Sequence, residues 1–206
     1  MVKILKADAS SLVQCVEALC KGKAIIYPTE TVYGLGVDAL NKKAVSDLLM
    51  IKERDPNKPI SIAVPEISAV EKFAEVNDAA LKLSKNFLPG PLTLVLKLKV
   101  DMSWLTSNKK IGIRVPANEF ALSLLKSFGK PITATSANIS GAGSAASSNQ
   151  VDQKLVQRVA IFVDDSKTQY GKASTVIDAS GGNLKILREG AVSRKAIENV
   201  LNTKIE

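Results

Sequence analysis

Short apolar runs alternate with amphipathic segments along this whole chain, and that alternation limits the fold more than any other feature. Strands are expected at 23–27, 60–64, 92–98, 111–115, 131–135, 159–163, 173–177 and 184–187. Helices are expected at 8–21, 44–54, 119–128 and 193–201, with one or two more within 68–87. No linker interrupts the alternation, so we predict an α/β fold in which residues 1–206 form a single domain with a twisted mixed sheet flanked by helices. The spacing does not reveal the strand order.

The first expected helix also contains both cysteines of the chain. Ser10 or Ser11 can cap its start, and Gly22 follows its end. The apolar side of this helix would hold Leu12, Val13, Val16, Leu19 and Cys20. Cys15 and Cys20 would lie about 140° apart around a helix of 3.6 residues per turn, so they cannot easily pair. The chain has no CxxC motif, which argues against a structural zinc site.

Composition excludes several classes of function. The chain has no histidine, which excludes Ser-His-Asp and Cys-His nucleophilic systems and HExxH metalloproteases. A net charge of +8 points to an anionic ligand such as a nucleotide or RNA. No apolar stretch approaches the roughly 18–20 residues that a membrane span needs, and the chain does not begin with a secretory signal. We therefore expect a cytoplasmic protein.

The segment Tyr-Pro-Thr-Glu-Thr-Val-Tyr-Gly-Leu-Gly at 27–36 places hydroxyls, an acid and two glycines after an expected strand. Loops at such positions commonly carry binding groups, and closely spaced glycines let backbone amides approach a ligand. A tight turn with exposed polar side chains is the alternative. The spacing Gly34-x-Gly36-x-x-Ala39 formally fits a dinucleotide fingerprint, but these glycines do not join a strand directly to a helix as that motif requires.

Lys52, Arg54 and Lys58 form a second cluster, at the end of an expected helix and in the turn after it. Arginine can bind phosphate oxygens bidentately while lysines act as mobile charges, so these residues could clamp a polyphosphate. A cationic helix terminus that complements the helix dipole explains the same charges. The chain contains no Walker A sequence, so an ordinary P-loop is excluded.

Two further segments place polar groups in or after expected strands. Arg114 interrupts an apolar strand, where it needs an anionic partner or the route to solvent that an edge strand offers. Ser136 and Asn138 follow another strand at its carboxyl end, where α/β sheets tend to bind ligands. Ordinary turn chemistry is the alternative for this pair.

Taken in order, these motifs resemble one family. The motif at 27–36 is followed by Lys-x-Arg with Lys-Pro four residues after the arginine, then by Gly-Pro-x-Thr, Arg-x-Pro and Ser-x-Asn-x-Ser-Gly. This order resembles the Sua5/YciO/YrdC family of threonylcarbamoyl-AMP synthases, from about residue 3 to residue 200. The resemblance implies a twisted α/β domain with a concave, positively charged cavity. The chain also looks like the short form, without the extra C-terminal domain of Sua5-type members.

The resemblance also assigns residues to ligands. It implies a catalytic tetrad around ATP made of Lys52, Arg54, Ser136 and Asn138. Further nucleotide contacts are implied for Lys58, Lys110, Ser144 and Arg188. L-Threonine would be held by Thr31, Arg114, Ser174 and the backbone near Ala134, with Arg114 meeting its carboxylate. The small residues of 140–149 are expected to form a lid over the nucleotide.

The implied reaction joins L-threonine, bicarbonate and ATP into threonylcarbamoyl-AMP and releases pyrophosphate. A transfer of this kind depends mainly on positioning and on compensation of developing charge, which suits a chain without histidine. Mg²⁺ is expected with ATP, held by phosphate oxygens and water rather than by a dedicated set of carboxylates. The product would pass to a separate threonylcarbamoyl transferase that modifies tRNA.

Three other functions fit parts of the sequence. A non-catalytic module could use the positive charge to bind tRNA or double-stranded RNA, although the hydroxyl and amide motifs exceed what phosphate contacts require. A carbamoyl-transferring relative from hydrogenase maturation shares the fold, usually within a longer chain that contains zinc-finger cysteines. A divergent YciO-type paralogue is the third alternative, and the intact Lys-x-Arg and Ser-x-Asn pairs argue against it.

Overall fold

Ten strands form one mixed sheet in the computed structural model, which describes residues 1–205. The strand order is β1-β8-β2-β3-β7-β4-β6-β5-β9-β10. Neighbouring strands are parallel in the pairs β1–β8, β8–β2, β4–β6 and β5–β9 and antiparallel in the others. The strands are β1 (Lys3–Lys6), β2 (Ile25–Tyr27), β3 (Gly34–Gly36), β4 (Ser61–Ala63), β5 (Leu92–Lys97), β6 (Lys110–Arg114), β7 (Ile132–Ser136), β8 (Ile161–Asp164), β9 (Thr175–Asp178) and β10 (Lys185–Arg188). The predicted α/β fold with a mixed sheet is confirmed.

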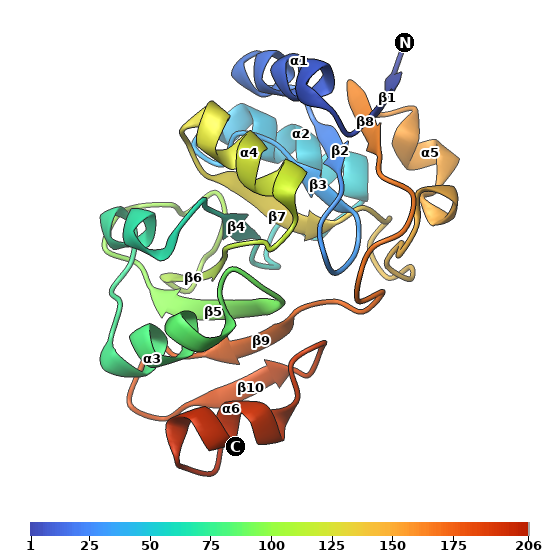
Figure 1. Cartoon of the computed structure of the whole chain (residues 1–206). Helices are drawn as coiled ribbons and strands as arrows, with labels where there is room; N and C mark the ends of the chain where they lie inside the picture. The colour runs from blue at the N-terminus through green and yellow to red at the C-terminus, as the bar shows by residue number, and fades with distance from the viewer. Residues whose placement is uncertain (206) are drawn as a thin grey trace.

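Helices cover both faces of this sheet (Figure 1). They are α1 (Ala9–Cys20), α2 (Lys42–Lys52), α3 (Asp78–Phe87), α4 (Glu119–Phe128), α5 (Gln153–Val156) and α6 (Arg194–Leu201), with 3₁₀ turns at Ile67–Lys72 and Ser148–Gln150. α1 and α4 lie side by side in Figure 1, and α3 and α6 pack together near β9 and β10. Side chains alternate along β2, so Ile25 and Tyr27 pack in the cluster of α1 and α4, whereas Ile26 packs in the cluster of α2.

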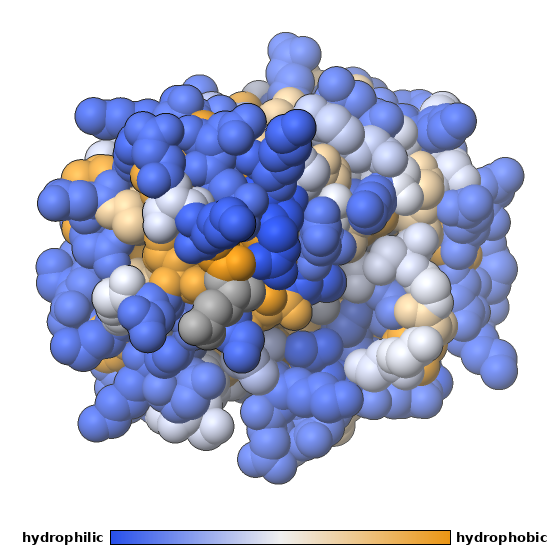
Figure 2. Space-filling model, turned by 90° about the horizontal axis from the view of Figure 1, so that it is seen from below, coloured by the Kyte–Doolittle hydropathy of each residue, from blue (hydrophilic) through white to orange (hydrophobic). Residues whose placement is uncertain are grey.

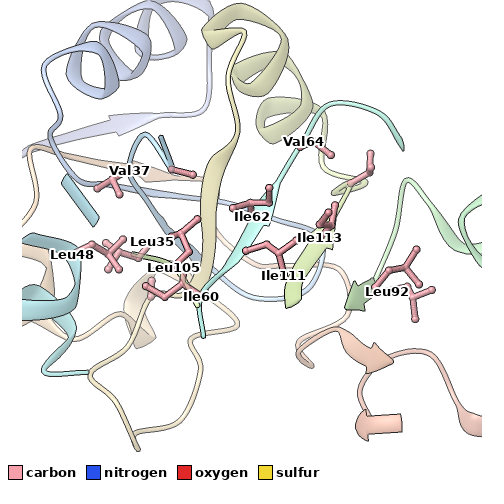
Figure 3. Close-up of a cluster of buried hydrophobic side chains, with 14 of the residues drawn as sticks. Leu35, Val37, Leu48, Ile60, Ile62, Val64, Leu92, Leu105, Ile111 and Ile113 are labelled. Atoms are coloured by element: carbon pink, nitrogen blue, oxygen red, sulfur yellow. The ribbon is translucent and has the colours of Figure 1, made fainter. Parts of the chain in front are cut away.

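The larger hydrophobic cluster fills the space between the sheet and the helices on its other face. Figure 3 shows part of it, with Ile62 of β4 close to Ile111 and Ile113 of β6. These three side chains are completely buried. They occupy every second position of their strands, and the intervening residues face the opposite side of the sheet. This division leaves one face of the central strands for the hydrophobic core and the other for polar groups.

Capping groups set the ends of the helices, and the apolar pattern of the sequence did not locate these groups. Asp8, not Ser10 or Ser11, caps α1: its side chain accepts from the Ser11 N–H, and the Asp8 backbone N–H donates to Ser11 Oγ, which completes a capping box. The expected apolar side is also partly wrong, because Val13 and Cys20 are exposed while Cys15, Ala18 and Leu19 are buried. Both cysteines are free, as expected.

The second helix also differs from its expected bounds at both ends. α2 begins at Lys42 because the Asn41 side chain accepts the N–H of Ala44 at 3.1 Å. It ends at Lys52 because Glu53 adopts a left-handed conformation with φ of 52°. Arg54 therefore lies beyond the helix, and the turn directs it independently of Lys52.

All eight expected strands exist, but β1 and β3 lie outside the predicted set. β3 is Gly-Leu-Gly, a composition that strands disfavour, and it exists because it pairs with β2 on one side and β7 on the other. A Cβ atom on Gly36 would lie 2.5 Å from the Ile132 side chain, so close packing requires this glycine. The edge-strand explanation for Arg114 is wrong, because β6 lies between β4 and β5.

The surface that faces downward in Figure 1, where α6 lies, is mostly hydrophilic (Figure 2). Hydrophobic residues gather most clearly in one area left of centre in this view. Within residues 1–205, every helix is too short or too polar to span a lipid bilayer.

Candidate functional site

A cavity of about 500 Å³ opens against the polar face of the central strands. Alternate residues of four strands line it: Ser61 and Ala63 of β4, Thr93 and Val95 of β5, Lys110, Gly112 and Arg114 of β6, and Val176 and Asp178 of β9. Three successive residues of β7 also line it, namely Ala134, Thr135 and Ser136. In β4, β5, β6 and β9, the period of two thus separates the lining residues from the buried isoleucines and leucines between them. Gly112 gives the cavity room, because a Cβ atom there would lie 2.2 Å from Ser61 Oγ.

Four cationic side chains line this cavity, namely Arg54, Lys110, Arg114 and Arg188. Asp178 is the one carboxylate among the described residues that line it. Low-dielectric walls strengthen the field of such a cluster, so the cavity suits an anionic ligand. The four cations come from sequence positions as far apart as 54 and 188.

Arg114 is the most buried of these cations. It is 8% exposed, and its NH2 group donates to Glu30 Oε1 at 2.8 Å and to Thr31 Oγ1 at 2.7 Å. The neighbouring Tyr27 is also buried, and burial raises the pKa of its hydroxyl to about 12. Glu30 is therefore the anionic partner that Arg114 requires in this buried position.

A second arginine meets a pair of hydroxyls. Ser174 Oγ lies 2.8 Å from Thr93 Oγ1, and the NH2 group of Arg188 donates to the Ser174 backbone oxygen at 2.8 Å and to Ser174 Oγ at 3.2 Å. Burial, followed by the charge of Arg114, lowers the pKa of Arg188. Both guanidinium groups line the same cavity, so an anion bound there would be stabilised by the charge of each.

Lys52 lies behind the cavity wall. It is 1% exposed, and its Nζ donates to the backbone oxygens of Ser136 and, at 2.8 Å, Asn138. The Ser136 hydroxyl in turn donates to the Asn138 side-chain oxygen. Burial, followed by the charge of Arg54, lowers the pKa of Lys52 to about 8. The structure therefore brings the Lys-x-Arg and Ser-x-Asn motifs together, with Lys52 holding the Ser136–Asn138 segment in place.

Arg54 faces the cavity from the turn after α2. Its NH2 group donates to the Pro59 backbone oxygen at 2.9 Å, while its Nε is buried without a partner among residues 1–205. Burial lowers the pKa of this arginine. An unpartnered buried donor is costly, so a ligand oxygen at this position would stabilise the site.

Lys110 and Asp178 form an ion pair of 2.9 Å at another part of the wall. Burial alone would raise the pKa of Asp178, but hydrogen bonds from Ser180 and the nearby Lys110 outweigh it, so this pKa lies below its ordinary value. Asp178 remains ionised at neutral pH and holds Lys110 at the cavity.

Not all of the other expected site residues line the cavity. Ala134 lines the cavity, whereas Thr31 and Asn138 support its wall through the hydrogen bonds described above. Lys58 and Ser144 are exposed and do not line the cavity. Ser144 belongs to the 140–149 loop, which the Tyr33 N–H anchors through the Ala145 backbone oxygen at 2.9 Å. Closure of this loop over a nucleotide stays a prediction.

Among the residues around the cavity that received no role from the sequence are Glu30, Thr93 and Asp178. Glu30 and Thr93 lie within recognised motifs, so the motifs marked the segments without saying which side chains face the cavity. Asp178 carries no motif, and only the pairing of β5 with β9 brings it opposite Val95, near Lys110.

Comparison with known proteins gives the family. The Sua5/yciO/yrdC family model, described as "Telomere recombination", matches residues 17–190. This chain belongs to that family. A Methanocaldococcus jannaschii member, provisionally named a threonylcarbamoyl-AMP synthase, is 37% identical over 198 residues that cover 93% of each protein. A Pyrococcus abyssi threonylcarbamoyl-AMP synthase is 38% identical over 184 residues, which cover 88% of this chain and 54% of that protein.

The fold of this Sua5/YciO/YrdC family member also matches a solved structure closely. The crystal structure of P. abyssi Sua5 complexed with L-threonine superposes with a TM-score of 0.93 at 33% identity. The match covers 100% of this chain and 62% of that one. The chain thus spans nearly all of the M. jannaschii protein, and somewhat more than half of both the P. abyssi synthase and the chain in the P. abyssi structure.

Proposed function

We propose that this protein is a threonylcarbamoyl-AMP synthase, a nucleotidyltransferase that uses L-threonine, bicarbonate and ATP. One observation carries the proposal: a single cavity joins residues expected to contact the nucleotide with residues expected to contact L-threonine. The first group is Arg54, Lys110, Ser136 and Arg188, and the second is Arg114, Ala134 and Ser174. The names of the relatives and the L-threonine in the P. abyssi structure support the same function.

Arg114 is suited to the carboxylate of the amino acid. Glu30 and Thr31 occupy its NH2 group, which leaves donors on Nε and NH1 for a ligand. The Nε is buried and has no hydrogen-bond partner among residues 1–205. A carboxylate here would satisfy this donor and make a charge-assisted hydrogen bond, which is stronger than a neutral one. The hydroxyls of Thr93, on the adjacent strand β5, and of Ser174, just before β9, offer polar partners to the rest of the amino acid.

The reaction has two steps in this proposal. The neutral threonine amine attacks the bicarbonate carbon, and one water leaves to give the N-carboxylate. An oxygen of this carboxylate then attacks the α-phosphorus of ATP, and the bond to the bridging oxygen breaks with release of pyrophosphate. Negative charge builds up on the phosphoryl and pyrophosphate oxygens, so cations held in place before the reaction lower its barrier.

The cations of this chain divide between the two substrates. Arg54 and Arg188 lie on the cavity wall with guanidinium groups that can bind phosphate oxygens bidentately, and Lys110 adds a mobile charge. Residues 1–205 contain no group of three or more His, Cys, Asp or Glu residues that could hold a metal ion. We therefore propose that Mg²⁺ arrives with ATP, where it neutralises phosphate charge while phosphate oxygens and water supply its ligands.

Use of the product in tRNA modification belongs to the same proposal. Threonylcarbamoyl-AMP is a reactive mixed anhydride, so a separate transferase must receive the threonylcarbamoyl group promptly.

The decisive experiment measures pyrophosphate release by the purified protein with ATP and Mg²⁺, with and without L-threonine and with and without bicarbonate. Release that requires both substrates is expected. Arg54→Ala should lower the rate roughly 10²–10³-fold, as loss of a donor that stabilises the transition state does elsewhere. Arg194→Ala is the matched control, because Arg194 also donates to a backbone oxygen, that of Ile205, but does not line the cavity.

Each other outcome points to a different function. Pyrophosphate release without L-threonine would indicate another acceptor of the adenylyl group. Nucleotide binding without turnover would favour the YciO-type alternative, and salt-sensitive RNA binding without nucleotide binding would favour an RNA-binding module. An Arg54→Ala protein with full turnover would remove the proposed role of that residue.

A further inference from the structure

Glu30 is a buried carboxylate just behind the cavity, in the loop between β2 and β3. Its side chain is 2% exposed, and its Oε1 accepts a hydrogen bond from Arg114 NH2 at 2.8 Å. Its Oε2 is buried without a hydrogen-bond partner among residues 1–205. A buried carboxylate destabilises the folded state strongly unless it is paired. Even in an ion pair, both charged groups lose hydration free energy when they are buried. Unlike an exposed pair, this buried pair can fix the guanidinium in one position.

Hydrogen bonds on both sides hold the loop that carries Glu30. The Tyr170 N–H donates to the Glu30 backbone oxygen at 2.8 Å, and Thr168 Oγ1 donates to the Thr31 backbone oxygen at 2.8 Å. Thr29 Oγ1 closes the loop by donating to the Val32 backbone oxygen at 2.6 Å. Glu30 is therefore a fixed point from which the orientation of Arg114 can be set.

The hydrogen bonds of Arg114 explain what this orientation achieves. A guanidinium group has five N–H donors, and Glu30 and Thr31 take the two on NH2. The donors on Nε and NH1 remain for a ligand in the cavity that Arg114 lines. Without Glu30, the guanidinium would lose its ion pair and could rotate away from this orientation.

We propose that Glu30 is a positioning residue, which orients the Arg114 guanidinium to receive the carboxylate of the amino-acid substrate. This inference rests on the proposed function, because it takes L-threonine as that substrate. Glu30 acts only through Arg114 and does not touch the substrate itself. Its effect should therefore concern the amino acid and its carboxylate, not ATP.

The test compares Glu30→Gln and Glu30→Asp with the wild-type protein. Gln keeps the shape but loses the charge, and Asp keeps the charge but is one methylene shorter. L-Threonine affinity should fall roughly 10–100-fold in both variants, which is the range expected when a hydrogen bond to a charged group is lost. Affinity for ATP, measured alone, should not change. Glu75→Gln is the matched control, since Glu75 pairs with Lys97 at 3.0 Å on the exposed surface.

Two further measurements separate orientation from a general structural effect. L-Threoninol lacks the carboxylate, so its affinity should be the same for Glu30→Gln and wild type. In the Arg114→Met background, Glu30→Gln should cause no further loss of L-threonine affinity, because the effect passes through Arg114. Three results would each overturn the inference. The losses of L-threonine affinity could add in the double variant, Glu30→Gln could lower the affinity for L-threoninol as much as that for L-threonine, or it could lower the affinity for ATP in parallel. If the wild-type protein itself binds no L-threonine, the proposed function fails. If the wild-type protein binds L-threonine but the variants do not behave as expected, only the role of Glu30 fails.

Discussion

Replacing Lys52 with methionine removes an ammonium group that is buried behind the cavity wall. Its Nζ donates to the backbone oxygens of Ser136 and Asn138, and its pKa is lowered from 10.5 to about 8 by burial and by the charge of Arg54. At about 1.4 kcal/mol for each tenfold change in proton affinity, protonated Lys52 is roughly 3 kcal/mol less favourable in the folded chain than in the unfolded chain.

Two opposing effects determine the stability of Lys52→Met near pH 7. Loss of two hydrogen bonds from a charged donor costs roughly 1.5–3 kcal/mol each. Relief of the buried charge offsets about 3 kcal/mol of this, so the net loss is roughly 0–3 kcal/mol. The pH dependence is sharper. Because the folded pKa lies below the unfolded one, the cost of the buried charge is fully present below about pH 8 and disappears as the pH rises toward 10.5.

Urea unfolding at pH 7 and pH 10 measures this effect. Wild type should gain roughly 2–3 kcal/mol relative to Lys52→Met between the two pH values, since other titrating groups are common to both proteins. Lys126→Met is the control, because Lys126 is exposed on α4. A difference between wild type and Lys52→Met that is equal at both pH values would refute the reasoning.

Three smaller changes test the packing, capping and burial that support the site. Gly36→Ala should destabilise the protein by roughly 1–3 kcal/mol, because the new Cβ would lie 2.5 Å from the Ile132 side chain, and thermal unfolding measures the loss. Asp8→Ala should cost about 1 kcal/mol by removing the cap of α1, and Asp8→Asn, which keeps an acceptor, should restore most of that stability. A thiol reagent should modify exposed Cys20 quickly and Cys15 only after unfolding, because burial raises the pKa of Cys15 to about 12; equal rates in the folded protein would contradict this burial.

The sequence predicted the elements of the fold well because most of them carry their own periodic pattern. α4 begins and ends where the pattern indicated, at Glu119 and Phe128, and each of the eight expected strands lies within two residues of its expected ends. β3 had no such pattern. Two of its three residues are glycine, and only its neighbours in the sheet make it a strand.

The motifs identified which residues belong to the site, but they did not show where each side chain lies in the folded protein. Lys52, Arg54 and Lys58 look equivalent in sequence, as cations near one helix end. In the structure, Lys52 is buried beneath a loop, Arg54 faces the cavity and Lys58 is exposed to solvent. The left-handed residue Glu53 turns the chain between Lys52 and Arg54, and no periodic pattern encodes that turn.

The sequence by itself determined the α/β class, the exclusion of histidine chemistry and the set of polar segments from which the site is built. Only the tertiary structure decided that Arg114 lies in a central strand and pairs with Glu30, and that Asp178 meets Lys110. The physical reason is that a local pattern fixes which residues share a face of a strand, whereas the strands that lie beside it depend on long-range pairing. The cavity is the product of that pairing, because its cations come from segments far apart in the chain.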